Sequence, residues 1–149
     1  MGAYETVLVG TDGSKSSLAA VDRAAAVAAT NEARLVIVCA YRPARRQEVL
    51  AAHDALRDDA YQVVGSTPAE EVLRIARERA AAAGAIAGET VAVLGEPVPA
   101  LTETAKRVAA QLLVVGNRGL NTLTGRILGS VPAEVARRSG VDVLIVCTT

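Results

Sequence analysis

The chain has 149 residues, and sixteen basic and sixteen acidic residues give it a formal net charge of +0. A neutral protein has no overall field to attract nucleic acid or an anionic membrane, so we expect neither as a partner. The N-terminal residues lack a basic stretch followed by an apolar core, and no apolar run approaches the roughly 18 residues of a membrane span. We therefore expect a soluble cytoplasmic protein, with residues 1–149 folded as a single domain.

The first half of the chain predicts a strand, a helix and a second strand. Residues 6–10 are apolar and end in the polar residues 11–14, which favours a strand followed by a turn and a helix cap. Apolar side chains then recur at helical spacing over residues 16–29, and Asn31 marks the stop. Residues 34–40 are predicted as the second strand, because the residues after Arg34 are apolar at successive positions, as is typical of a parallel strand covered on both faces.

The second half continues the alternation of helix and strand. Residues 42–66 lack a regular pattern, and we expect a connection that carries one short helix. Thr67 as a cap and Pro68 in the first turn predict a helix that reaches residue 83 and ends at Gly84. The remaining predicted elements are a strand at 90–95, a helix at 98–110, a strand at 112–115, a helix at 130–139 and a strand at 141–147. The alternation predicts an α/β fold, an open doubly wound sheet of five parallel strands with helices on both faces.

The region after the predicted strand 112–115 has the composition of a phosphate cradle. Gly116 and Gly119 remove side chains that would keep a ligand from the main chain, and Gly129-Ser130 opens a helix. The first amides of a helix have no partner within it, and its dipole favours an anion there. The structural alternative is that these glycines only shape a long connection between strand and helix.

Other known sites are excluded by their missing motifs. The chain has neither Gly-x-x-x-x-Gly-Lys-Ser/Thr nor Gly-x-Gly-x-x-Gly after the first strand, so it is not a P-loop NTPase or a typical dinucleotide binder. Cys39 and Cys147 end Val-rich runs outside any Cys-x-x-Cys motif, which favours buried hydrophobic roles. His53 is the one histidine, and no Gly-x-Ser-x-Gly elbow accompanies it. With no paired carboxylates or histidine base beside the glycines, we identify no catalytic residue.

The spacing Gly116-x2-Gly119-x9-Gly129-Ser130, the turn at residues 9–14 and the final strand at 143–146 resemble the universal stress protein family. The resemblance covers almost the whole chain. It implies a Rossmann-like sheet of strand order 3-2-1-4-5, with the first and fourth strands side by side at the switch point. Members with this glycine spacing hold an adenine nucleotide there, commonly ATP and in some cases cyclic AMP.

The resemblance also implies roles for individual residues. The phosphate would be surrounded by Gly116, Gly119, Gly129 and Ser130, and Val131 would also belong to the nucleotide site. The first turn would supply Gly10, Thr11, Asp12 and Gly13, with Asp12 near the ribose or, for ATP, a Mg²⁺ ion. Adenine would meet the backbone of Ala40, and the ligand would be touched or closed over by Asn117, Arg118 and Leu120. Structural alternatives are that Asp12 only forms a turn and that Ser130 only caps its helix.

Two features favour a compact nucleotide. Pro132 has no backbone N–H to offer a terminal phosphate, and Gly10 lets a ligand approach the main chain. These features make cyclic AMP or AMP a rival to ATP as the ligand, and of these nucleotides we favour cyclic AMP. A binding protein in signalling, sequestration or stress response is expected, with at most slow ATP hydrolysis. The alternative function is a dimeric interaction module with a vestigial pocket.

The last strand bears on assembly. Residues Val143 to Thr148 are apolar and short and come at the end of the predicted sheet. An exposed edge strand of this kind pairs readily with its copy across a twofold axis. Similar proteins in the family dimerise in this way, and we expect a homodimer.

Overall fold

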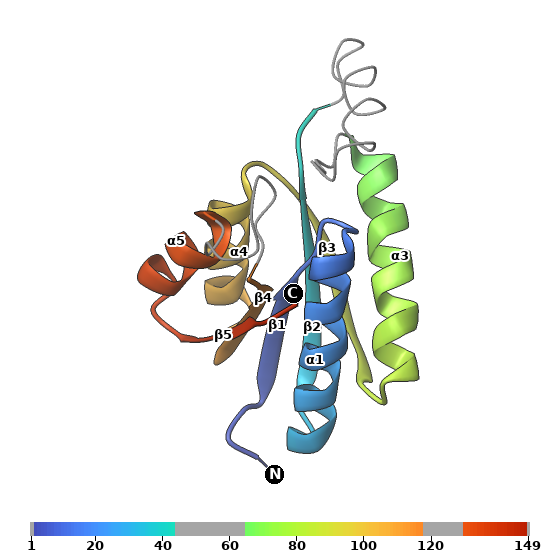
Figure 1. Cartoon of the computed structure of the whole chain (residues 1–149), viewed down its shortest axis with the longest axis vertical. Helices are drawn as coiled ribbons and strands as arrows, with labels where there is room; N and C mark the ends of the chain where they lie inside the picture. Colours follow the sequence, from blue (N-terminus) through green and yellow to red (C-terminus); the bar gives the residue numbers. More distant parts are fainter. Residues whose placement is uncertain (1, 44–64, 118–129, 149) are drawn as a thin grey trace.

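The structure, a computed structural model, describes residues 2–43, 65–117 and 130–148. In this part of the chain, parallel strands form one sheet in the order β3-β2-β1-β4-β5 (Figure 1). The strands are β1 (Thr6–Gly10), β2 (Arg34–Tyr41), β3 (Ile86–Leu94), β4 (Leu112–Gly116) and β5 (Asp142–Val146). The predicted five-stranded parallel sheet and its strand order are confirmed.

Helices cover both faces of the sheet, as predicted. They are α1 (Lys15–Asn31), α3 (Ser66–Ala82), α4 (Pro97–Arg107) and α5 (Ser130–Arg138). Helices α1 and α3 pack side by side on one face, and α4 and α5 cover the other (Figure 1). Alternate residues of β1 serve the two layers, because Val7 and Val9 join the apolar cluster under α1 and α3 while Leu8 joins the cluster under α4 and α5. None of the helices in the described ranges is both long and apolar enough to cross a membrane.

Helix α1 starts and stops where its sequence signals lie. Ser14 is the N-cap, and its side chain accepts a hydrogen bond from Ser17 N at 3.2 Å. The helix ends at Asn31, and Glu32 follows in the left-handed conformation with φ 55°. The helix is therefore slightly longer at both ends than residues 16–29.

The predicted cap of α3 is wrong. Gly65, at φ 93°, occupies the N-cap position, and Thr67 lies inside the first turn. Gly65 N donates to the carbonyl of Arg42 at 2.7 Å, so the chain enters the helix from the end of β2. A glycine reaches this conformation without the steric cost that a threonine would carry. The predicted short helix within 42–66 falls largely on 44–64, outside the described residues.

Strand β3 begins four residues earlier than predicted. A Cβ built on Gly88 would lie 1.4 Å from the carbonyl oxygen of Leu35, and the pairing with β2 shifts register between Arg34 and Val36. The glycine therefore marks an irregularity inside the strand, not the boundary of the strand. Helices α4 and α5 and strand β5 are shorter than predicted and end at Arg107, Arg138 and Val146, whereas β4 extends one residue further than predicted, to Gly116.

Candidate functional site

The switch point of the sheet lies between β1 and β4. These strands are parallel neighbours, with Val7 opposite Leu112 and Val9 opposite Val114. The chain leaves β1 through α1 toward β2, and it leaves β4 toward α5 and β5 on the other side. The loops after β1 and β4 therefore start at one edge of the sheet, where doubly wound proteins bind ligands.

The residues after β1 form a hydrogen-bonded turn. Thr11 is buried, and its N–H donates to the carbonyl of Val38 in β2 at 2.9 Å. Its Oγ1 lies 2.9 Å from Ser17 Oγ and accepts from Gly13 N at 3.1 Å. Gly13 has φ 85°, a left-handed conformation that glycine adopts at little cost. Predicted site residues 11–13 are thus brought together in one rigid turn at the start of α1.

Asp12 forms part of this turn. Its Oδ1 accepts a hydrogen bond from Ser14 N at 2.9 Å, the contact of an Asx turn. The turn-forming role is confirmed, and a ribose or metal role for the carboxylate stays a prediction. No group of three metal-binding side chains gathers in the described ranges 2–43, 65–117 and 130–148.

The charge of Asp12 acts on the buried Cys39. Burial and, secondarily, the Asp12 carboxylate raise the pKa of the Cys39 thiol to about 12. Cys39 is therefore a neutral hydrophobic residue at physiological pH, as predicted, whereas Cys147 is exposed and departs from the prediction of a buried role. Ala40 follows Cys39 near the carboxyl end of β2 and is partly exposed, which leaves its predicted contact with adenine open.

The two strand-end glycines face helices on opposite sides of the sheet. A Cβ on Gly10 would lie 2.7 Å from Leu101 Cδ2 in α4. A Cβ on Gly116 would lie 2.7 Å from Ser16 Oγ and 3.2 Å from the carbonyl oxygen of Ser16 in α1. Both glycines therefore admit a helix close to the sheet. Their predicted part in ligand approach stays a prediction.

Asn117 is tied to the segment after β5. Its N–H donates to the carbonyl of Val146 at 2.9 Å, and its Oδ1 accepts from Thr148 N at 3.0 Å and from Thr148 Oγ1 at 2.8 Å. Thr148 Oγ1 also lies 2.7 Å from Ser16 Oγ. The carboxamide oxygen of Asn117, a residue predicted to touch or close over ligand, thus accepts its hydrogen bonds from Thr148. Sequence reasoning missed Ser16 and Thr148, and their one signal is that each is a polar residue directly beside a predicted helix start or strand end.

The remaining predicted cradle is partly described. Because β4 and β5 are parallel, α5 runs back from the carboxyl edge, and its N-terminus at Ser130 lies at that edge. Val131 packs in the cluster under α4 and α5, and Pro132 is fully buried. The residues that lie outside the described part are Arg118, Gly119, Leu120 and Gly129.

Comparison with known proteins identifies the family. The model of the universal stress protein family matches residues 3–146. Universal stress protein Rv1636 of Mycobacterium tuberculosis H37Rv is 54% identical over 149 residues, which is 100% of both chains.

Solved structures agree on the fold. A universal stress protein crystallised in complex with cAMP is 51% identical, with a TM-score of 0.76 over 99% of this chain and 100% of that one. The universal stress protein of Archaeoglobus fulgidus in complex with dAMP shares the fold at 19% identity, with a TM-score of 0.69 over 97% of this chain and 98% of its own. The chain belongs to the universal stress protein family.

Proposed function

We propose that the chain is a single-domain adenine-nucleotide-binding protein that prefers cyclic AMP and acts in signalling, nucleotide sequestration or a stress response. The observation that carries the proposal is the cAMP complex of a protein 51% identical over 99% of this chain. The geometry supports it, because β1 and β4 end side by side at the switch point of the sheet.

The proposed site has two halves. The turn after β1 supplies one half and the exit of β4 with the start of α5 supplies the other. Asp12 Oδ1 is engaged with Ser14 N, and we assign Oδ2 to a ribose hydroxyl. Main-chain amides at the start of α5 donate to the phosphate. The assigned residues are Gly10, Thr11, Asp12, Gly13, Ala40, Gly116, Asn117, Arg118, Gly119, Leu120, Gly129, Ser130 and Val131.

The start of α5 supports a small phosphate group. Pro132 is the third residue of the helix and is buried in the apolar layer. Since proline has no N–H, the first helical turn offers the amides of Ser130 and Val131 but none from the next residue. A single phosphodiester needs fewer donors than a triphosphate, which favours cyclic AMP.

Competition titration with a fluorescent adenine nucleotide tests the proposal. Cyclic AMP is expected to displace the probe at lower concentration than ATP, measured with and without Mg²⁺. ATP displacing it far better would overturn the preference, and no displacement by any adenine nucleotide would overturn the function.

A pair of glycine variants tests where the ligand sits. Gly129→Val should abolish binding, because a side chain would occupy the proposed cradle. Gly140→Ala is the matched control, since it strains a left-handed glycine at φ 69° just beyond the opposite end of α5, where a Cβ meets open space. Undiminished binding by a folded Gly129→Val protein would place the cradle elsewhere.

We further propose a homodimer formed through residues 143–148. Strand β5 is at the edge of the sheet and pairs with β4, and Val143, Leu144 and Ile145 are only partly buried in the single chain. Such an edge favours pairing with a second copy. Light scattering should give about twice the chain mass of 15.3 kDa, and Ile145→Lys should halve it. A dimer that binds no adenine nucleotide would favour the interaction module instead.

A further inference from the structure

We propose that Thr148 and Ser16 are positioning residues of the nucleotide site, which hold the exit of β4 against the first turn of α1. The proposal rests on the nucleotide binding proposed above. Neither residue is assigned a ligand contact. Both act through Asn117 and Gly116, the described residues from which the second half of the site starts.

The hydrogen bonds form a directed chain. Asn117 Oδ1 has no hydrogen, so Thr148 donates to it both from its N–H at 3.0 Å and from its hydroxyl at 2.8 Å. The single hydroxyl hydrogen of Thr148 is then used, and Ser16 must donate to Thr148 Oγ1 across the 2.7 Å contact. Bonds in such a chain polarise and strengthen one another. The order Ser16 to Thr148 to Asn117 thus couples three segments.

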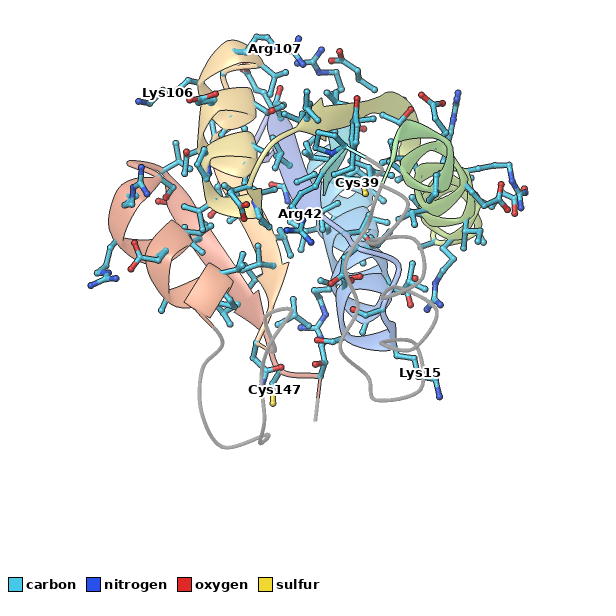
Figure 2. The ribbon with its side chains drawn as sticks, turned by 90° about the horizontal axis from the view of Figure 1, so that it is seen from above. Lys15, Cys39, Arg42, Lys106, Arg107 and Cys147 are labelled. Atoms are coloured by element: carbon cyan, nitrogen blue, oxygen red, sulfur yellow. The ribbon has the colours of Figure 1, made fainter. Side chains whose placement is uncertain are left out.

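These segments are far apart in sequence but meet at the site. Ser16 lies in the first turn of α1, directly after the turn that holds Asp12, while Asn117 follows the last residue of β4. In Figure 2, Lys15 and Cys147, the chain neighbours of Ser16 and Thr148, lie on the same side of the molecule, opposite Lys106 and Arg107. The chain of hydrogen bonds therefore fixes the relative placement of the two halves of the proposed site.

Gly116 makes this junction tight. Its missing side chain leaves room for Ser16 Oγ, which would otherwise lie 2.7 Å from a Cβ. The first turn of α1 therefore packs directly against the end of β4, and we expect a displacement of Ser16 to displace Gly116 as well. The Thr148 hydroxyl closes the same junction from the side of β5.

Loss of the Thr148 hydroxyl should affect binding more than folding. Thr148 lies beyond the end of β5 at Val146 and is only partly buried, so the sheet and both apolar layers form without its hydroxyl. The main-chain hydrogen bond from Asn117 N to the carbonyl of Val146 also does not depend on the Thr148 hydroxyl. Loss of the hydroxyl is expected to change the position of Asn117, because its Oδ1 then accepts a hydrogen bond from Thr148 N alone.

The test compares Thr148→Val with Thr148→Ser and Tyr4→Phe. Valine keeps the shape but not the hydroxyl, and serine restores the hydroxyl. Tyr4→Phe is the matched control, because it removes a hydroxyl bond of 2.9 Å to Asp142 at the other end of β5. Cyclic AMP affinity and dissociation rate are measured by titration and stopped flow, and stability by urea unfolding.

We expect Thr148→Val to bind cyclic AMP about three- to tenfold more weakly through faster dissociation, the effect of one lost hydrogen bond. Thr148→Ser should return affinity to the wild-type value, and Tyr4→Phe should leave it unchanged. Ser16→Ala removes the hydrogen bond that Ser16 donates to Thr148. This variant therefore tests the same role if Thr148→Val does not fold.

The outcomes separate this inference from the proposed function. If the wild-type protein binds cyclic AMP and Thr148→Val or Ser16→Ala binds it with the same affinity, the positioning role alone is overturned. Equal weakening in Tyr4→Phe also overturns it, because binding would then report general stability. A wild-type protein that binds no adenine nucleotide overturns the proposed function together with this inference.

Discussion

Replacing Gly116 with alanine tests whether this glycine is required by helix packing. The new Cβ would lie 2.7 Å from Ser16 Oγ and 3.2 Å from the carbonyl oxygen of Ser16, both inside ordinary contact distance. Forcing a methyl group into such a space costs about 1–3 kcal/mol. Gly116 is not among the described glycines with positive φ, so alanine also restricts the unfolded chain and recovers about 0.4–1 kcal/mol. The net loss of unfolding free energy is therefore about 1–2 kcal/mol.

The assay is urea unfolding of the apo protein in a double-mutant cycle with Ser16→Ala. Removing Ser16 Oγ takes away the nearest atom and leaves the backbone oxygen at 3.2 Å. In the Ser16→Ala background, Gly116→Ala should therefore cost at most about 0.5 kcal/mol. In the wild-type background the same change should lower Tm by about 3–8 °C, given the length of the chain.

The cycle has a clear refuting result. If Gly116→Ala costs the same with and without the Ser16 hydroxyl, Ser16 is not what the glycine accommodates. If Gly116→Ala leaves stability unchanged but abolishes nucleotide binding, the glycine serves ligand approach, and the packing argument is wrong.

Three further predictions concern Gly88, Asp12 and the cysteines, and they are tested by urea unfolding together with nucleotide titration and thiol labelling. Gly88→Ala should lose about 3 kcal/mol or more, because its Cβ would lie 1.4 Å from a β2 carbonyl oxygen; a loss under 1 kcal/mol would contradict the irregular register. Asp12→Asn should keep the turn and weaken nucleotide binding, whereas Asp12→Ala should also lose about 1 kcal/mol of stability. The folded-state pKa of Cys39 is raised to about 12 from 9.0, so its contribution to stability is complete below pH 9.0 and disappears as pH rises to about 12. Cys39→Val should remove this dependence, and at pH 8 a thiol reagent should modify Cys147 alone in the native state.

The sheet could be predicted from sequence because its signals are local and repeated. Strand β2 is apolar at successive positions from Leu35 to Ala40, which is typical of a strand buried on both faces. Ser14 and Asn31 likewise mark the ends of α1, since capping depends on neighbouring residues. The strand order came from family resemblance, and the structure confirms it.

The errors occur where distant backbone decides the local structure. Gly88 looks like a strand breaker, yet it is required because β2 approaches it through Leu35. Gly65 replaces Thr67 as the cap of α3 because its N–H is held by the carbonyl of Arg42. Neither contact can be read from the neighbouring sequence.

The sequence predicted which residues form the candidate site more completely than it predicted the hydrogen bonds between them. The sequence placed Asp12 and Gly13 in a turn, and hydrogen bonds confirm that turn. The partner of Asn117 could not be predicted, because Thr148 is 31 residues away and follows a strand whose position depends on the whole sheet. Polar contacts between loop ends are fixed by tertiary structure, which leaves no periodic signal in the sequence.

The two strand-end glycines constrain how a ligand can reach the switch point. Gly10 faces α4 and Gly116 faces α1, so both layers of helices close on adjacent strands from opposite sides. A ligand at this point is therefore screened from both faces of the sheet by packed helices. It must approach along the strand direction, where the start of α5 presents main-chain N–H groups. We expect such an approach to favour ligands whose small anionic group enters first, so the proposed nucleotide phosphate would suit this edge better than an extended apolar molecule.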